Sequence, residues 1–288
     1  MPKNDSIKDI SQFLRELKKL KKNNDNEFFF RGEVKKFPKR VPSIYRDDSW
    51  LKNEDKLFRE FVLRNPNEFI NEKSTFEILA KMQHYSLPTR LLDITSNPLI
   101  ALFHACNDEI SINQQGYVYV FNIPNEYIRF YDSDRVSVVS NISRLPIKRT
   151  NFFNISKNRS ESNNEFIKRF NKNKHIKYLD HEIKGEKPYF QPIIDQKHIN
   201  KIWCVKPQLK NPRIIKQDGA FLLFGIKGKN KECLELADIF KTITLKIKRG
   251  KTKHEMLNDL EILGISKDKL FPEMDIIAKF LQTKFKSK

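Results

Sequence analysis

The segment from residue 82 to 107 restricts the fold of this chain more than any other part of its sequence. It begins with a helical pattern, continues through the short apolar run RLLDI, which predicts a strand, and reaches Asn97-Pro98. Asparagine is a favoured helix N-cap and proline is favoured in the first helical turn, so we predict a helix that begins at Pro98. That helix, PLIALFHA, is apolar on nearly every side, which means that it must be deeply packed.

Polar side chains are dense in this same segment although its neighbours are apolar. They are Gln83, His84, Tyr85, Thr89, Arg90, Asp93, Thr95, Ser96 and Asn97. Buried polar groups need partners, and Thr95 and Ser96 precede a helix N-terminus, where free N–H groups and the helix dipole favour an anion. Helix capping is the alternative for each of these two residues alone. Taken together, the residues from Gln83 to Pro98 predict a site for a phosphate-bearing ligand, and a nucleotide in particular.

Two of these polar residues differ in the direction that a strand would give them. Arg90 and Asp93 lie three positions apart, so in a strand they face opposite sides and are not expected to pair with each other. His84 is a candidate for proton transfer because the ordinary pKa of histidine is near neutrality. The alternative is a histidine that only hydrogen-bonds the backbone near a turn. We expect His104, on the apolar helix, to be a core residue.

A second signal lies near the start of the chain. Residues 27–30 read Glu-Phe-Phe-Phe, which predicts a buried strand, and that strand ends at Arg31-Gly32. An arginine at the end of an apolar strand is well placed to face a cleft. The alternative for Arg31 is a structural ion pair. We include Arg31 and Gly32 in the predicted ligand site.

The remaining pattern mixes helices and strands without regular alternation, which favours an α+β fold over a doubly wound sheet. Further helices are predicted at 6–22, 54–64, 75–84, 231–240, 251–263 and 273–285, and further strands at 117–123, 201–205, 213–215, 220–226 and 242–247. We expect a single domain over 1–288. Within it we distinguish a leading amphipathic helix in 1–24, a polar, basic insertion at 150–200 with one or two short helices, and a helical C-terminal segment at 250–288.

Charge and composition narrow the partners. A formal net charge of +19 attracts polyanions, so a nucleic acid, a nucleotide or an acidic macromolecule is an expected partner. The alternative is a generic solvated lysine surface, because the lysines are spread along the chain. Without a membrane-length apolar run or a signal peptide, we expect a cytoplasmic protein. No metal-ligand spacing is visible among its histidines and three scattered cysteines, so we expect no structural metal.

Several of these segments resemble the FRG-domain family, which is named after the Phe-Arg-Gly triplet that stands here as residues 30–32. The matching stretches are FFFRG (28–32), PSIYR (42–46), MQHYSLPTRLLDITSNPLIALFHAC (82–106), KQDGAFLLF (216–224) and LGISKDKLFPEMD (263–275). The chain departs from the family at Ser86, where glycine is usual, and at Ile94, where an aromatic residue is common. The resemblance implies a prokaryotic or phage-related setting and a role in phage defence or as a toxin.

The order of the segments is also similar to that of the ADP-ribosyltransferase fold, a mixed, strongly bent, antiparallel-rich sheet with flanking helices. In that fold an arginine ends an early strand, a Ser-Thr-Ser type motif precedes an apolar helix, and a Glu-containing motif opens a later strand. The counterparts here would be residues 30–32, 93–96 and 217–219. The resemblance implies NAD as the ligand, with Arg31 on its pyrophosphate and Thr95 or Ser96 beside its ribose. We assign Gln83 and Arg90 to the same binding site.

The third counterpart lacks a charge that the chemistry would use. Active transferases place a glutamate where this chain has Gln217, and a glutamine cannot stabilise developing positive charge in the same way. His84, Asp93 and Gln217 are therefore the catalytic candidates, with His84 or Asp93 replacing the missing carboxylate. No GxGxxG, P-loop or GxSxG motif occurs. The open alternatives are an NAD-dependent transferase or glycohydrolase, a non-catalytic basic nucleic-acid-binding module, and a nuclease-like effector that uses His84 and Asp93.

Overall fold

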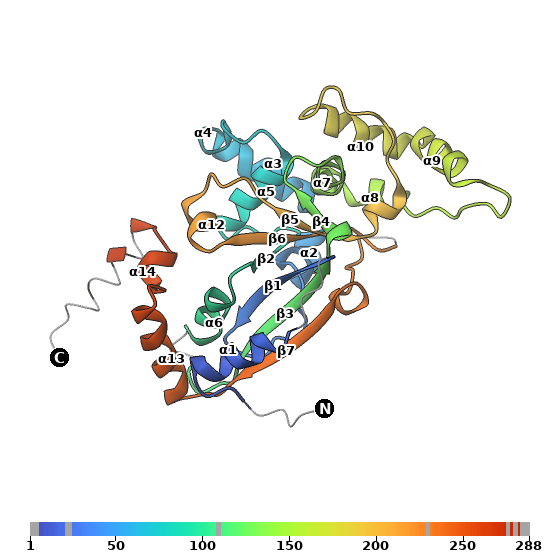
Figure 1. Cartoon of the computed structure of the whole chain (residues 1–288). Helices are drawn as coiled ribbons and strands as arrows, with labels where there is room; N and C mark the ends of the chain where they lie inside the picture. Colours follow the sequence, from blue (N-terminus) through green and yellow to red (C-terminus); the bar gives the residue numbers. More distant parts are fainter. Residues whose placement is uncertain are drawn as a thin grey trace.

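Seven strands form a single sheet in the order β4-β5-β6-β2-β1-β3-β7 (Figure 1). The computed structural model describes residues 6–20, 25–107, 111–228 and 231–274, together with 277, 278 and 282. The strands are β1 (Asn26–Glu33), β2 (Leu91–Thr95), β3 (Gly116–Pro124), β4 (Ile128–Phe130), β5 (Ile202–Lys206), β6 (Gly219–Phe224) and β7 (Lys241–Ile247). Among the strands of the described residues, only β4 and β5 pair in parallel. The prediction of an α+β fold with a mixed, antiparallel-rich sheet is confirmed.

Helices flank this sheet. They are α1 (Ile10–Lys18), α2 (Asp48–Lys52), α3 (Glu54–Arg64), α4 (Pro66–Phe69), α5 (Thr75–His84), α6 (Pro98–Cys106), α7 (Asp134–Ser140), α8 (Ile147–Thr150), α9 (Asn163–Lys172), α10 (Lys174–Lys184), α11 (Gln196–Ile199), α12 (Pro212–Lys216), α13 (Lys251–Ile262) and α14 (Lys267–Leu270). Helices α3 and α5 have the predicted bounds. Among the residues that the structure describes, no helix combines the length and apolarity that crossing a bilayer requires.

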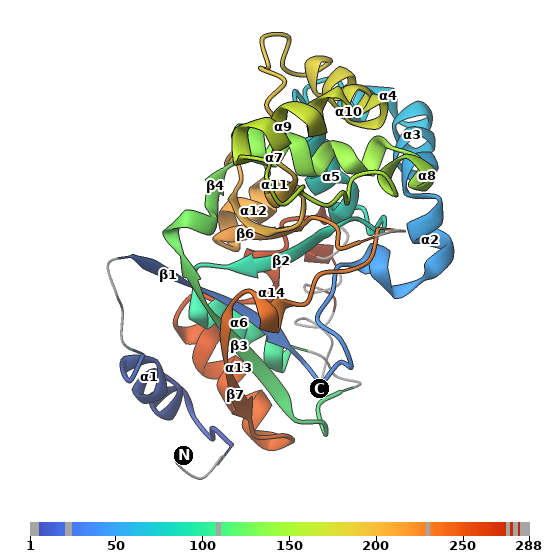
Figure 2. The same ribbon diagram turned by 90° about the vertical axis from the view of Figure 1, so that its right-hand side faces the viewer.

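The sheet is weakly joined in its middle. Strands β1 and β2 pair at a single position, Phe30 with Thr95, whereas β1 pairs with β3 over its whole length and β2 pairs with β6 over its whole length. The sheet therefore consists of two halves, β4-β5-β6-β2 and β1-β3-β7, and Figure 2 shows β1 and β2 diverging from each other. Strand ends that separate in this way leave backbone and side chains free to border a cavity.

Each half of the sheet has its own helical cover. One core cluster packs α3, α5, α7 and α10 against the first half, and includes Phe76, Leu91, Trp203 and Leu223. A second packs α1, α6 and α13 against the other half, and includes Phe30, Val118, Val120 and Ile247. A third fills the opposite face of the sheet with Phe29, Leu92, Tyr119 and Leu222. The boundary between the two covers coincides with the boundary between β1 and β2.

Gly32 explains how α6 can lie so close to β1. A Cβ at Gly32 would stand 1.8 Å from the carbonyl oxygen of Ala101, and a Cβ at Gly116 would stand 2.5 Å from that of Ala105. Any side chain at these positions would push the helix off the strands. The glycine of the Phe-Arg-Gly triplet therefore has a packing role, because it lets helix α6 lie directly against strand β1.

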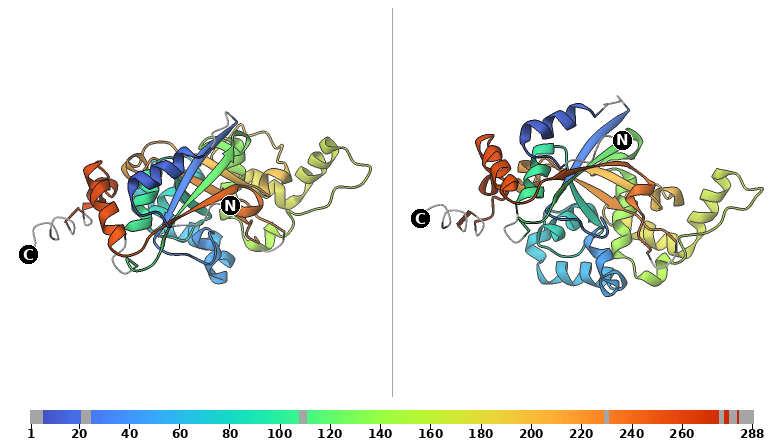
Figure 3. Two further views of the ribbon diagram at one scale, coloured as in Figure 1. Left: turned by 60° about the horizontal axis from the view of Figure 1, so that its bottom comes forward. Right: turned by 90° about the horizontal axis from the view of Figure 1, so that it is seen from below.

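Two predicted elements are wrong. Residues 213–215 were predicted as a strand but belong to helix α12, because the Asn211 side chain caps that helix and Pro212 opens it. The described part of 231–240 contains only the short 3-10 helix Leu236–Asp238. Most of the helix predicted at 273–285 lies outside the described residues. Within 150–200 the chain forms α9, α10 and α11. Helix α10 contributes buried side chains to the first core cluster, and α9 lies further out (Figure 3).

Candidate functional site

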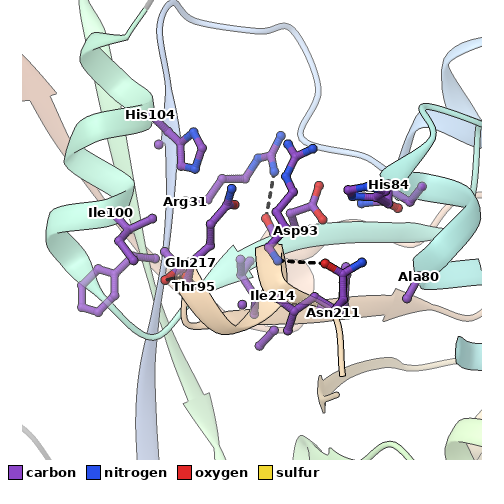
Figure 4. A pocket seen from close by; sticks show the side chains of 18 of the residues that line it. Arg31, Ala80, His84, Asp93, Thr95, Ile100, His104, Asn211, Ile214 and Gln217 are labelled. Atoms are coloured by element: carbon purple, nitrogen blue, oxygen red, sulfur yellow. Dashed lines mark hydrogen bonds between the residues drawn. The ribbon is translucent and has the colours of Figure 1, made fainter. Parts of the chain in front are cut away.

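A cavity of about 330 Å³ lies where β1 and β2 separate. Strands β1, β2 and β6 and helices α5, α6 and α12 supply its walls (Figure 4). Seven of the nine predicted site residues line it, namely Arg31, Gly32, Gln83, His84, Asp93, Thr95 and Gln217. These residues come from segments far apart in the sequence, and the fold brings them to one place.

Arg31 bridges the two halves of the sheet at the cavity. Its Nη1 donates a hydrogen bond of 2.8 Å to the backbone oxygen of Asp93 (Figure 4), and its Nε donates one of 3.1 Å to Oε1 of Glu33. Its side chain remains 20% exposed. A guanidinium carries five N–H donors, so Arg31 is held in position from two sides and keeps donor capacity for a ligand.

The end of β2 is tied to the chain that precedes β6. The buried hydroxyl of Thr95 donates a 2.7 Å hydrogen bond to the backbone oxygen of Gln217 and accepts one from the backbone N–H of Asn97. Ser96 does not line the cavity, and its backbone N–H donates to the oxygen of Asp218 at 3.0 Å. Thr95 thus braces the site, while Ser96 holds the turn before α6 and is not placed to touch a ligand in the cavity.

Gln217 sits at the C-terminal end of α12, where its amide is used on both sides. Its Nε2 donates a 3.0 Å hydrogen bond to the backbone oxygen of Leu270. Its side chain also hydrogen-bonds His104, which raises the pKa of that histidine slightly against larger opposing effects. Gln217 therefore links α6 to Leu270, the last residue of α14, and its position in the cavity wall is fixed.

Two histidines face the cavity, and both are held in the neutral form. Burial lowers the pKa of His104 to about 4, with the positive charge of Arg31 as the next cause. Burial also lowers the pKa of His84, and the nearby charge of Arg213 adds to this effect. The prediction that His104 is a core residue needs correction, because its helix is buried but its side chain lines the cavity. A neutral imidazole can accept a proton.

Asp93 is the exposed residue of an otherwise buried strand. Leu91, Leu92, Ile94 and Thr95 of β2 are buried, and Asp93 between them is exposed. Its carboxylate borders the cavity, and its backbone oxygen receives Arg31. Gln83 lines the same wall from α5, and its Oε1 accepts a 2.5 Å hydrogen bond from the Thr89 hydroxyl. Asp93 and Gln83 thus both line the cavity.

Arg90 does not belong to this cavity. It is fully buried, and its Nε and Nη2 donate to the two carboxylate oxygens of Glu54 at 2.8 and 2.5 Å. Its Nη1 donates to the backbone oxygen of Phe224 at 2.9 Å, and Lys231 joins Glu54 from the other side at 2.7 Å. A binding role for Arg90 is therefore corrected to a structural one. The partner Glu54 opens helix α3, and nothing in the sequence pattern marked it as a partner of β2.

Helix α12 contributes residues that the sequence reading missed. Asn211 and Arg213 line the cavity, but residues 213–215 had been predicted as a strand. The signal was available, because Asn211-Pro212 repeats the start signal that located α6 at Asn97-Pro98. Within the described ranges, no group of three or more His, Cys, Asp or Glu residues is arranged to hold a metal ion.

Comparison with protein families matches residues 26–114 to the FRG domain. The chain contains an FRG domain. The matched part includes β1, β2, α5 and α6, so it supplies Arg31, His84 and Asp93 to the cavity. Helix α12 and strand β6, with Arg213 and Gln217, lie beyond the match, which covers less than half of the chain. Comparison with curated proteins and with solved structures gave no match.

Proposed function

We propose that the cavity beside the FRG triplet binds a phosphate-bearing nucleotide, with NAD or an ADP-ribose-type compound as the leading ligand. One observation carries this proposal: Arg31, Thr95 and Gln217 come from three separate segments and line one cavity at the junction of β1 and β2. If the chain shares the segment order of ADP-ribosyltransferases, these three residues are expected to lie together in one site. The volume of about 330 Å³ lies at the lower end of the range for small-molecule sites.

Some residues of the cavity would bind the ligand by charge, and others hold the cavity walls in position. Arg31 offers a planar fork of donors, which suits the paired oxygens of a pyrophosphate. Thr95 and Gln217 hold the walls through their mutual hydrogen bond. Apolar side chains such as Ile94, Ile100 and Phe221 line the rest of the cavity, and they suit the flat face of a base or a nicotinamide ring.

For catalysis we propose an ADP-ribosyltransferase-like or glycohydrolase reaction. The bond between ribose C1′ and the nicotinamide nitrogen breaks, and its electron pair leaves with nicotinamide. The oxygen of water, or a nucleophile of a target, then forms a bond to C1′ and gives up its proton. Neutral His84 takes that proton, and Asp93 supplies the negative charge that stabilises the positive ribose in the transition state. Gln217 positions these groups and brings no charge.

The setting implied by the family resemblance gives this proposal its biological form. We propose an effector of prokaryotic or phage-related origin that acts in defence or as a toxin, with its target a macromolecule attracted by the charge of +19. Transfer of ADP-ribose to such a target would use the cavity and the net positive charge together.

Calorimetry with NAD and ADP-ribose on the full chain tests the binding step. We expect Arg31→Lys to weaken ADP-ribose binding by about tenfold or more, because lysine cannot reproduce the paired contacts of a guanidinium. Arg15→Lys on the exposed face of α1 is the matched control and should bind like the natural protein. If neither compound binds the natural protein, the proposal is wrong. Release of nicotinamide from NAD, with candidate targets present, tests the chemical step separately.

The net charge also favours a second function, a non-catalytic module that binds nucleic acid through its basic surface. That function predicts an affinity that falls steeply with salt, because each neutralised phosphate releases a counterion. It also predicts that Arg31→Lys keeps full affinity for nucleic acid, since Arg31 lies in the cavity wall and a lysine would preserve its charge. Binding of ADP-ribose and binding of nucleic acid, both measured with Arg31→Lys, therefore distinguish the two functions.

A further inference from the structure

The last residue of α14 and the residues that follow it lie against the cavity wall. Leu270 accepts the hydrogen bond of Gln217, and the ring of Phe271 lies under the guanidinium of Arg213, 4.7 Å from ring centre to Cζ. The same ring meets His104 edge to face, with 5.9 Å between centroids. Three residues that line the cavity are thus in contact with this short segment, and the segment continues to Glu273.

Glu273 directs its carboxylate at two further contacts with lining residues. Its Oε1 lies 3.5 Å from Nη1 of Arg213 and 3.7 Å from Nε2 of His84. Both carboxylate oxygens are buried, yet within the described part of the chain neither has a hydrogen-bond partner. A buried acceptor without a hydrogen bond is unfavourable, because it has lost its contacts with water and gained none in exchange. The carboxylate therefore lies near the Arg213 guanidinium and the neutral His84 imidazole without a hydrogen bond to either.

We propose that Arg213 and His84 form a second anion subsite of the cavity, that the Glu273 carboxylate occupies it in this structure, and that a phosphate group of the ligand displaces Glu273. This inference rests on the proposed nucleotide function and adds a residue pair to it. The ligand class is a compound with two linked phosphates, one for the Arg31 side and one for the Arg213 side. Displacement of Glu273 would also release the segment from 271 to 273 from the cavity wall.

A phosphate is a stronger occupant of this place than a carboxylate. It offers three acceptor oxygens and more negative charge, and arginine binds such groups by two parallel hydrogen bonds. The 3.5 Å between Nη1 of Arg213 and Oε1 of Glu273 exceeds the usual length of a hydrogen bond, so the carboxylate leaves donor capacity on this arginine. The two arginines serve one cavity, since the charges of both Arg31 and Arg213 act on the imidazole of His104.

Removal of the competing carboxylate provides the test. Calorimetry on the full chain with ADP-ribose and with inorganic pyrophosphate should show about fivefold tighter binding to Glu273→Gln than to the natural protein, because the ligand no longer displaces a charge. Glu261→Gln is the control, since it removes the same charge from an exposed position on α13. Arg213→Met should weaken both ligands by about tenfold, whereas Lys216→Met, exposed on the same helix, should leave affinity nearly unchanged.

The direction of the Glu273→Gln effect decides the matter. Weaker or unchanged binding would overturn the displacement, because Glu273 would then contact the ligand or lie outside its path. An equal gain in Glu261→Gln would also overturn it, since long-range charge would explain the effect. If ADP-ribose does not bind any variant, the nucleotide function is wrong. In that case, tighter pyrophosphate binding to Glu273→Gln would still support the anion subsite.

Discussion

Arg90 immediately precedes strand β2, and Arg31 of strand β1 donates a hydrogen bond to Asp93 of β2, yet the two arginines have different roles. Arg90 is fully buried and spends its guanidinium on both oxygens of Glu54 and on a backbone carbonyl. Arg31 has one carboxylate oxygen and one backbone oxygen as partners, and 20% of its side chain stays exposed at the cavity. The number of donors already used within the protein therefore separates the structural arginine from the one that can bind.

The surroundings of the two arginines differ in the same way. Around Arg90 the charges are closed in: burial alone would raise the pKa of Glu54, but Arg90 and Lys231 beside it bring that pKa below its usual value. Burial lowers the pKa of Lys231, against the pull of Glu54. At the cavity, two arginines stand near two neutral histidines. The charges around Arg90 are paired within the protein, whereas those at the cavity remain able to contact a ligand.

The largest expected effect is the loss of the buried arginine. Arg90→Met leaves Glu54 without its bidentate partner, so we expect the free energy of unfolding to fall by about 3–5 kcal/mol, the usual cost of breaking a buried pair. Arg31→Met should cost less than Arg90→Met, because the Arg31 side chain is 20% exposed and contacts one carboxylate oxygen, but it should abolish ADP-ribose binding. Urea denaturation measures the first quantity and calorimetry the second. Equal destabilisation by both variants would remove the distinction between the two regions.

Two glycines of the cavity wall give the next effect. We expect Gly32→Ala to destabilise the protein by about 1–3 kcal/mol or more, because overpacking forces backbone shifts and the new Cβ would meet the Ala101 oxygen at 1.8 Å. Gly219→Ala is the matched control, since its Cβ would find its nearest neighbour at an ordinary 3.4 Å. Thermal unfolding of both variants is the measurement. A mild Gly32→Ala would mean that α6 can move away from β1.

The cavity histidine should make stability depend on pH. The pKa of His104 is about 4 in the folded protein against 6.5 for a free histidine, so between these values the unfolded chain binds a proton that the native protein does not. Stability from this source is complete above about pH 6.5 and falls as the pH is lowered towards 4, by about 1–3 kcal/mol. Urea midpoints measured through this interval should fall less steeply for His104→Gln. Parallel curves for the two proteins would contradict the assignment.

The sequence predicted the parts of the site that depend on local signals better than the parts that depend on contacts between distant segments. Strand β2, helix α6 and their junction follow from the apolar run and from Asn97-Pro98, because these signals are local. The separation of Arg90 from Asp93 also followed from strand alternation, although the partner Glu54 did not, since it comes from a distant helix. Helix α12 was missed because three apolar or basic residues were given more weight than the cap before them.

The contribution of Glu273 could not be predicted for a further reason. Its position depends on how the segment after α14 folds back onto α12, and that contact is set by tertiary packing of Phe271 and Arg213. The similarity in segment order directed attention to Gln217 as the place for an acid. The structure instead brings a carboxylate to the cavity wall from 56 positions further along the chain.

The smallest effect concerns Ser86, at the cavity wall, where the resemblance to the FRG family leads us to expect glycine. Ser86 has a φ of 63°, in the left-handed region that only glycine enters without strain. Ser86→Gly should therefore stabilise the protein, but by less than about 1 kcal/mol, because the added freedom of the unfolded chain offsets part of the gain. Ser133→Gly is the control, since Ser133 has an ordinary φ of −64° and makes no capping hydrogen bond, so it should be destabilised. If both variants lose stability in urea titrations, the backbone strain at Ser86 is too small to measure. A glycine expected at this position would then serve access to the cavity and not backbone geometry.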